Sequence, residues 1–202
     1  LPLPLPLFCV LLAIQIFVVY GLLALAGLRM CRNLKREPAP ILTSWFSNGE
    51  FKLKLSDTVW AFGTGLLCGV VLLVAIFLIG QLLPQTLPKE MHPPTFASAL
   101  LGSATASFGE EIICRLFLLS ALIRLFSKSQ KSTMIAVIIS SVAFGVLHAP
   151  AAVFLFGGVA NVPFLFWVWL IVLNGIVGLA CAFWFLRIGI GGAILVHFGT
   201  DL

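Results

Sequence analysis

Two glutamates and an arginine interrupt an otherwise apolar stretch, FGEEIICRLF, at residues 108–117. A charged side chain near a bilayer centre costs at least about 2.5 kcal/mol, so such residues usually have a partner or a function. Glu111 and Arg115 are four residues apart with the acid first, the favourable order for a helical ion pair. Glu110 is turned about 100° away from Glu111 on a helix. We predict a structural Glu111–Arg115 pair that leaves Glu110 available for chemistry.

Two histidines and an aspartate lie in other apolar segments. Phe144 and His148 are one helical turn apart, which predicts an aromatic pocket wall beside the imidazole. His197 and Asp201 have the same spacing, so the carboxylate can orient that imidazole. These residue types suit hydrolysis, because a carboxylate away from water can act as a general base and an imidazole can donate to an oxyanion.

The depth of these residues in their segments is similar. At about 1.5 Å per helical residue, Glu110 lies about 21 Å from either end of its helix, and His148 about 22 Å above the start of its own. His197 and Asp201 lie about 15 and about 21 Å beyond Arg187. We therefore predict one polar site at mid-membrane depth with Glu110, His148, His197 and Asp201 as its catalytic candidates.

The composition is that of an integral membrane protein. Of the 202 residues, 61% are hydrophobic and 9% are charged, whereas about a quarter are charged in soluble domains. The net charge of +5 does not indicate nucleic-acid binding, since the basic residues gather at the ends of apolar runs, as topology signals do. We expect the lipid bilayer, and no nucleic acid, as a partner.

The apolar runs predict an all-α, polytopic transmembrane helix bundle of about six spans. A span needs about 20 helical residues, and the last run, with about 14, is short. The segments lie near residues 7–28, 57–82, 96–123, 133–149, 164–186 and 189–202. We assign residues 1–94 to N-terminal membrane helices with a connector, and residues 95–202 to a four-helix catalytic core. Within 57–82, the sequence GLLCG (65–69) predicts close packing on another helix.

Basic residues are distributed unevenly when the six spans alternate. Lys89 alone falls on one side, and Arg115 lies within a span. The other side receives Arg29, Arg32, Lys35, Arg36, Lys52, Lys54, Arg124, Lys128, Lys131 and Arg187. The positive-inside rule predicts that these basic loops and the connector are cytoplasmic.

Three motifs together resemble a known family. They are EEIICR (110–115), FGVLH (144–148) and HFGTD (197–201), in the order EExxxR, FxxxH and HxxxN or HxxxD of the CPBP family of intramembrane proteases. That family, also called the Abi family, includes the type II CAAX prenyl endopeptidases. The resemblance covers about residues 95–202, and the sequence has no HExxH, GxGD or rhomboid-type GxSG motif.

The resemblance implies a role for each matched residue. Glu110 would activate water together with His148, while His197 and residue 201 would bind or polarise the scissile carbonyl. Two positions depart from the family pattern: Leu116 stands where Gly is common, and Asp201 where many relatives have Asn. An ionised Asp cannot donate to an oxyanion, so Asp201 either orients His197 or binds a metal.

The metal requirement has two readings. We expect no obligatory metal, and the alternative is zinc held by His148, His197, Asp201 and Glu110, with an open position for water. The expected function is an intramembrane endopeptidase that uses a Glu/His-activated water on membrane-associated peptide or protein substrates, with prenylated CAAX-type tails as one class.

Two other function classes remain open. One is a catalytically silent family member that serves as an accessory or immunity-type subunit of a larger membrane complex. The other is a proton relay or transporter, which buried Glu, His and Asp residues also mark. The intact motif set favours the protease over the first alternative. The absence of paired inverted repeats with broken helices counts against the second.

Overall fold

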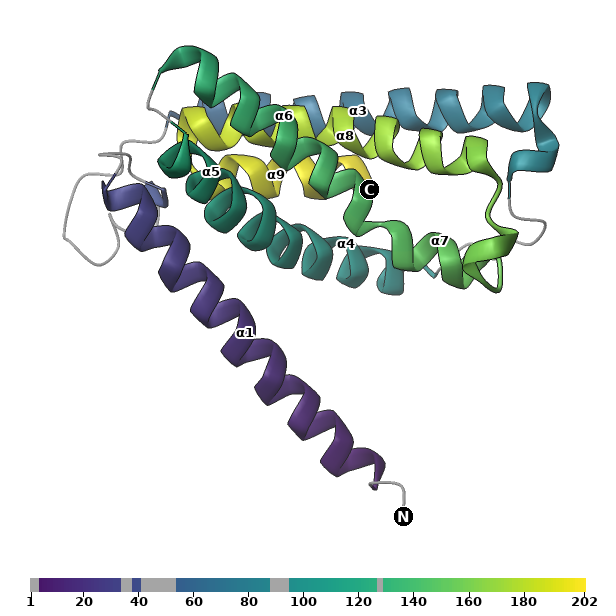
Figure 1. The fold of residues 1–202 in the computed structure, drawn as a ribbon, viewed down its shortest axis with the longest axis horizontal. Coiled ribbons are helices and arrows are strands. Elements are labelled where there is room, and N and C mark those ends of the chain that lie inside the picture. The colour runs from purple at the N-terminus through teal and green to yellow at the C-terminus, as the bar shows by residue number, and fades with distance from the viewer. Residues whose placement is uncertain (1–3, 34–37, 41–53, 88–94, 127–128) are drawn as a thin grey trace.

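The computed structural model describes residues 4–33, 38–40, 54–87, 95–126 and 129–202, and within these ranges the chain is helical with no strand. Most helices lie side by side in one bundle, and α1 (Leu5–Asn33) runs obliquely away from it (Figure 1). The predicted connector and Lys35, Arg36, Lys52, Lys89 and Lys128 lie outside the described residues.

Four described segments are long and apolar enough to cross a membrane. They are α1, α3 (Leu55–Leu82), the segment Gln130–Leu155 and α8 (Phe164–Ile188). The segment 130–155 combines α6 (Gln130–Leu147) with the short α7 (Ala149–Leu155). Two single 3₁₀ turns, η1 (Pro84–Thr86) and η3 (Val159–Asn161), lie in connections. The all-helical membrane architecture is confirmed, whereas the count of six spans stays a prediction.

The predicted span 96–123 is helical throughout but is not one α-helix. It consists of α4 (Phe96–Glu111), a π-helical stretch η2 (Ile112–Leu119) and α5 (Ser120–Leu125). The helix therefore changes type directly after the paired glutamates. Ser120, the first residue of α5, donates its hydroxyl to the backbone carbonyl of Arg115 in η2 over 3.3 Å. Such π-helical segments are rare and often lie at functional sites.

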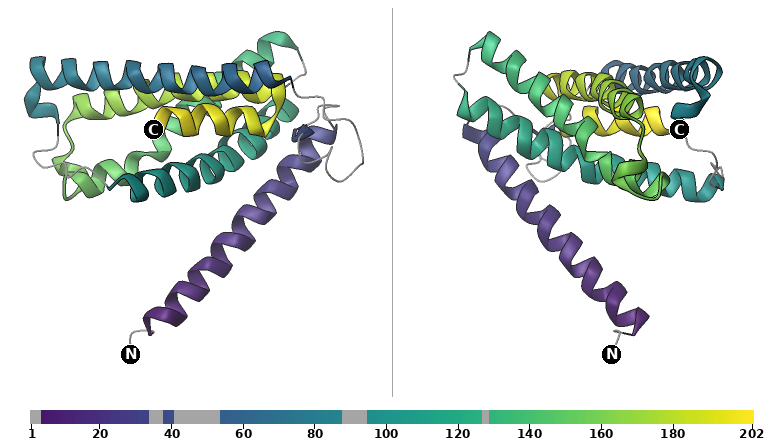
Figure 2. Two further views of the ribbon diagram at one scale, coloured as in Figure 1. Left: turned by 180° about the vertical axis from the view of Figure 1, so that it is seen from behind. Right: turned by 45° about the vertical axis from the view of Figure 1, so that its right-hand side comes forward.

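The short helix α9 (Ile190–Asp201) lies among α3, α4 and α8, and the two turned views agree on this placement (Figure 2). Its contact with α3 depends on small residues. A Cβ at Gly65 would lie 2.2 Å from the carbonyl oxygen of Val196, and a Cβ at Gly69 would lie 2.7 Å from that of Thr200. The close packing predicted from GLLCG is confirmed, and the neighbour is α9.

Gly65→Ala should therefore destabilise the protein, whereas Gly63→Ala should not. The added methyl group at Gly65 meets backbone, which cannot move aside as a side chain can, so we expect a loss of about 1–3 kcal/mol. Gly63 has open space around its Cβ position, and Ala there raises helix propensity by up to about 1 kcal/mol. Thermal unfolding of the two purified variants measures the difference. Equal stability would contradict the close α3–α9 contact.

The first helix packs on the bundle mainly through its C-terminal part. It packs mainly on η2 and α5, Tyr20 also reaches Gly109 of α4, and the N-terminal half stands clear of the bundle in all ribbon views (Figures 1 and 2). A Cβ at Gly27 would lie 2.3 Å from the carbonyl oxygen of Leu116. The absence of a side chain at Gly27 thus lets α1 approach the backbone of η2 closely.

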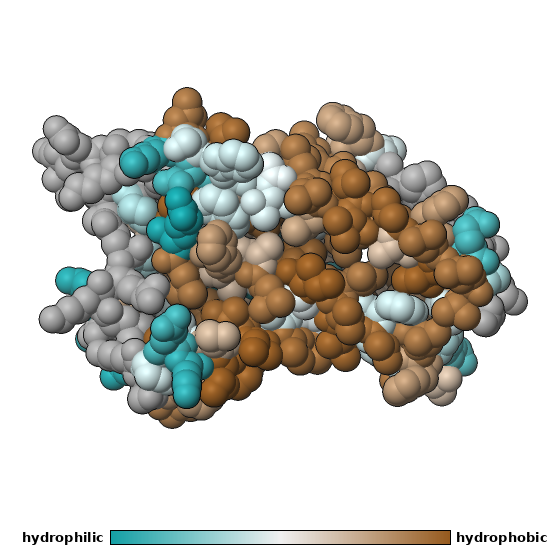
Figure 3. Space-filling model, turned by 90° about the horizontal axis from the view of Figure 1, so that it is seen from above, coloured by the Kyte–Doolittle hydropathy of each residue, from teal (hydrophilic) through white to brown (hydrophobic). Residues whose placement is uncertain are grey.

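Three segments meet at one end of the bundle. Arg187 Nη2 at the end of α8 lies 3.1 Å from Asp57 Oδ1 at the start of α3, and the Ile190 backbone amide donates to the Pro38 carbonyl over 2.7 Å. On the space-filling view, hydrophilic residues gather toward the two ends with an apolar expanse between them (Figure 3). Together with the four long apolar segments, this distribution indicates a multi-pass membrane protein. The assignment of this end to the cytoplasmic side stays a prediction.

Candidate active site

The three motifs meet around the ring of Phe144. Its centroid lies 5.1 Å from that of His148 and 5.2 Å from that of His197. The Arg115 guanidinium carbon lies 4.5 Å from the same centroid. Phe144 is almost fully buried. The residue predicted as a pocket wall thus lies between the two imidazoles, at the centre of the polar cluster.

Glu110 and His148 face each other across the first half of this cluster. His148 Nε2 lies 3.7 Å from Glu110 Oε2, and both side chains are partly exposed, at 26% and 29%. His148 Nδ1 lies 2.9 Å from the Phe144 carbonyl oxygen. A carbonyl only accepts, so Nδ1 carries a proton and Nε2 is directed toward Glu110.

The position of His148 follows from a break between two helices. α6 ends at Leu147 and α7 begins at Ala149, so His148 caps both. Pro150 has no backbone N–H and its ring clashes with a preceding turn, which ends a continuous helix at this point. The break leaves the Phe144 carbonyl available to the imidazole, and this hydrogen bond fixes the direction of Nε2.

Glu111 has a second charged-group partner besides the predicted arginine. Its Oε2 lies 3.2 Å from Arg115 Nε, as the sequence predicted. Its Oε1 lies 2.9 Å from His197 Nδ1. Glu111 and Arg115 are both 0% exposed. The second contact joins residues 86 positions apart, so no local spacing could reveal it.

Arg115 is held by the backbone of α8 as well as by Glu111. Its Nη2 donates to the Gly178 carbonyl over 2.8 Å. A Cβ at Gly178 would lie 3.1 Å from the same nitrogen. The absence of a side chain at Gly178 therefore lets the guanidinium reach the helix backbone. Arg115 connects η2 with α8 while it neutralises Glu111.

His197 and Asp201 form the predicted pair on α9. His197 Nε2 lies 3.5 Å from Asp201 Oδ2. The imidazole is buried, whereas the carboxylate is about one third exposed. Three successive contacts between polar side chains therefore form a line from Arg115 through Glu111 and His197 to Asp201. Glu110 and His148 lie beside this line, across the Phe144 ring.

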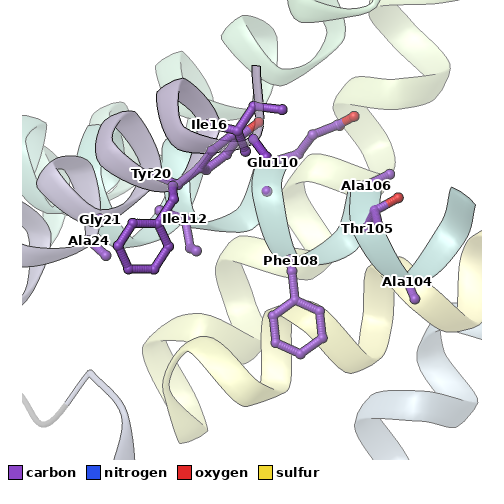
Figure 4. A pocket seen from close by; sticks show the side chains of 13 residues that line it. Ile16, Tyr20, Gly21, Ala24, Ala104, Thr105, Ala106, Phe108, Glu110 and Ile112 are labelled. Atoms are coloured by element: carbon purple, nitrogen blue, oxygen red, sulfur yellow. The ribbon is translucent and has the colours of Figure 1, made fainter. Parts of the chain in front are cut away.

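Glu110 also lines an apolar groove between α1 and α4, with a volume of about 1010 Å³. Figure 4 shows Glu110 beside the side chains of the two helices. The groove is lined mainly by Ala13, Ile16, Phe17, Tyr20, Gly21 and Ala24 of α1 and by Ala104, Thr105, Ala106, Phe108 and Gly109 of α4. Glu110 Oε2 has no hydrogen-bond partner among the described residues.

The arrangement does not fit the alternative zinc set. Among the described residues, no three His, Cys, Asp or Glu side chains are placed so that they could hold one metal ion. The candidate ligands instead form two pairs separated by Phe144, and His197 Nδ1 is already bonded to Glu111. The metalloprotease reading of the sequence therefore has no support in this geometry.

Residues 92–202 match the Rce1-like type II CAAX prenyl endopeptidases. This match covers more than half of the chain. The chain belongs to the Rce1-like family. No curated protein and no solved structure matched it. The matched region contains all three motifs of this Rce1-like protein, and its membership makes it a CAAX protease family member with peptide substrates as the implied class.

Proposed function

We propose that the protein is an intramembrane endopeptidase that hydrolyses membrane-associated substrates with a water activated by Glu110 and His148. The observation that carries this proposal is that Glu110 Oε2 and His148 Nε2 face each other over 3.7 Å, while Glu110 also lines an apolar groove. A water about 2.8 Å from both atoms can donate one proton to each. Its lone pair is then directed away from both, toward a substrate carbonyl carbon.

Glu110 can both accept and return the proton that the reaction moves. The water oxygen forms a bond to the carbonyl carbon, and its proton moves to Glu110. The C–N bond then breaks, and the proton from Glu110 passes to the leaving amine. No step needs a metal, and we propose that none is obligatory.

The groove supports lipid-bearing substrates. It is apolar along α1 and α4 and reaches Glu110, so an apolar anchor could lie there while the peptide bond reaches the acid. Prenylated CAAX-type tails have this form, with an isoprenoid close to the cleaved bond. We propose these tails as the substrate class of the site.

The deciding experiment is a cleavage assay on the full chain in proteoliposomes with a farnesylated CAAX peptide. We expect release of the terminal tripeptide at equal rates with and without a zinc chelator. Loss of cleavage on chelation, restored by added zinc, would refute the metal-free mechanism. A protein that binds the peptide and never cleaves it would refute the protease and favour an accessory subunit.

Filling the groove should impair lipidated substrates selectively. Gly21 lines the groove with open space around its Cβ position, so Gly21→Phe is the substitution that adds bulk to the groove. If the ring displaces about two methylene groups of the lipid, the cost is about 1.6 kcal/mol, a rise in KM on the order of 10-fold. The exposed Gly102 has equal space outside the groove lining, and Gly102→Phe should leave KM unchanged. Equal KM values in the two variants would exclude the groove as the lipid site.

A further inference from the structure

We propose that Glu111 is a positioning residue for this hydrolysis, and that it fixes which His197 nitrogen serves the substrate. This inference rests on the proposed function. Glu111 is fully buried, so it cannot touch a substrate. It acts instead through its 2.9 Å bond to His197 Nδ1. The structure thereby gives Glu111 a second role besides the predicted pairing with Arg115.

The protonation of His197 Nδ1 follows from Arg115. A guanidinium remains charged and only donates, so its contact with Oε2 keeps the Glu111 carboxylate ionised. Both oxygens of that carboxylate are then acceptors, and the bond at Oε1 requires a proton on Nδ1. Hydrogen bonds of this charge-assisted kind are stronger and better oriented than neutral ones. The imidazole is therefore held in one orientation with Nε2 directed toward Asp201.

The other nitrogen then becomes the donor of the site. Asp201 Oδ2 lies 3.5 Å from His197 Nε2, and an unprotonated Nε2 would place two acceptors against each other. A proton on Nε2 removes that repulsion, and the two flanking carboxylates stabilise the imidazolium. The other groups that face this pair are Glu110 from α4, and Phe144 and His148 from the end of α6. Nε2–H can then polarise the carbonyl that the Glu110 water attacks.

This arrangement divides the two histidines by function. His148 Nδ1 donates to a neutral carbonyl and its Nε2 remains an acceptor for water. His197 Nδ1 donates to a carboxylate and its Nε2 serves as a donor for the oxyanion. The difference between the two Nδ1 partners thus assigns one imidazole to each side of the reaction.

The test separates positioning from simple neutralisation of Arg115. Arg115→Met alone removes the cation and leaves a carboxyl group at position 111, whose oxygen can still accept a hydrogen bond from His197 Nδ1. The double variant Glu111→Gln with Arg115→Met is neutral at both positions and removes the carboxylate. We expect kcat per folded molecule to fall about 10- to 100-fold from the single to the double variant, the size of loss seen when a partner that orients a metal-bound imidazole is removed. KM should stay within error, because Glu111 does not contact substrate.

A spectroscopic measurement tests the same inference without activity. The chain has three histidines, so ¹⁵N resonances of His197 can be assigned with His92→Gln and His148→Gln variants. We expect wild-type His197 to be protonated at both nitrogens, and the double variant to lose the charge-assisted Nδ1 signature. Equal kcat in the single and double variants, or an unprotonated Nδ1 in the wild type, would overturn the positioning role. Failure of the wild type to cleave would refute the proposed function, while the spectrum would still decide the role of Glu111.

Discussion

Glu110→Gln should fold normally and cleave at least about 10²-fold more slowly than the wild type. The amide retains the size of the carboxylate, and Glu110 Oε2 has no hydrogen bond among the described residues that the substitution could break. The amide group cannot, however, accept a proton from water. The measurement is kcat on the farnesylated CAAX peptide, with thermal unfolding as the check on folding.

A second variant tests whether Glu110 and His148 act as one unit. His148→Ala removes the other acceptor of the water and should impair cleavage to a similar extent. The double variant should lose little more, because groups that act on the same water are not additive. A Glu110→Gln protein that cleaves at the wild-type rate would exclude this carboxylate as the base. Losses that multiply in the double variant would show that the two residues act separately.

Arg115→Met should destabilise the protein by about 3–5 kcal/mol, the usual cost of leaving one charge of a buried pair uncompensated. Glu111 is 0% exposed, so no water can solvate its carboxylate once the guanidinium is gone. The hydrogen bond to the Gly178 carbonyl is lost as well. Thermal unfolding in detergent measures the loss.

The charge-neutral double variant with Glu111→Gln is the matched control for this prediction. It removes both charges together, so it should recover much of the stability that Arg115→Met loses. If Arg115→Met unfolds at the wild-type temperature, the pair does not support the fold. If the double variant is no more stable than the single one, the loss comes from the Gly178 contact or from packing rather than from the charge.

Local spacing in the sequence predicted the contacts that lie within one helix. The Glu111–Arg115 and His197–Asp201 pairs follow from four-residue spacing, and GLLCG predicted a close helix contact. Contacts between helices could not be predicted in this way, since spacing says nothing about which faces meet. The Glu111–His197 bond is the main case. The assignment of Phe144 to a pocket wall was incomplete for the same reason, because its position between two imidazoles depends on how α6 and α9 pack.

The backbone conformation at two places was also not predicted from the sequence. The run 96–123 is apolar and has no proline, so nothing in its pattern indicated the change to η2 after Glu111. The sequence HAP at 148–150 did carry a signal, because proline ends a helix near this position. A reader of that tripeptide could have placed His148 at a helix junction, where an imidazole can bond the free Phe144 carbonyl.

The contact between α3 and α9 affects the order in which the protein is completed during its synthesis. Thr200 donates its hydroxyl to the Gly65 carbonyl, and the two residues are 135 positions apart. At roughly 5–20 residues per second, the ribosome needs on the order of ten seconds to add the intervening chain. During that interval α3 resides in the bilayer without its helical neighbour. His197 and Asp201 arrive with that neighbour, so the polar cluster is completed only after α9 has been made.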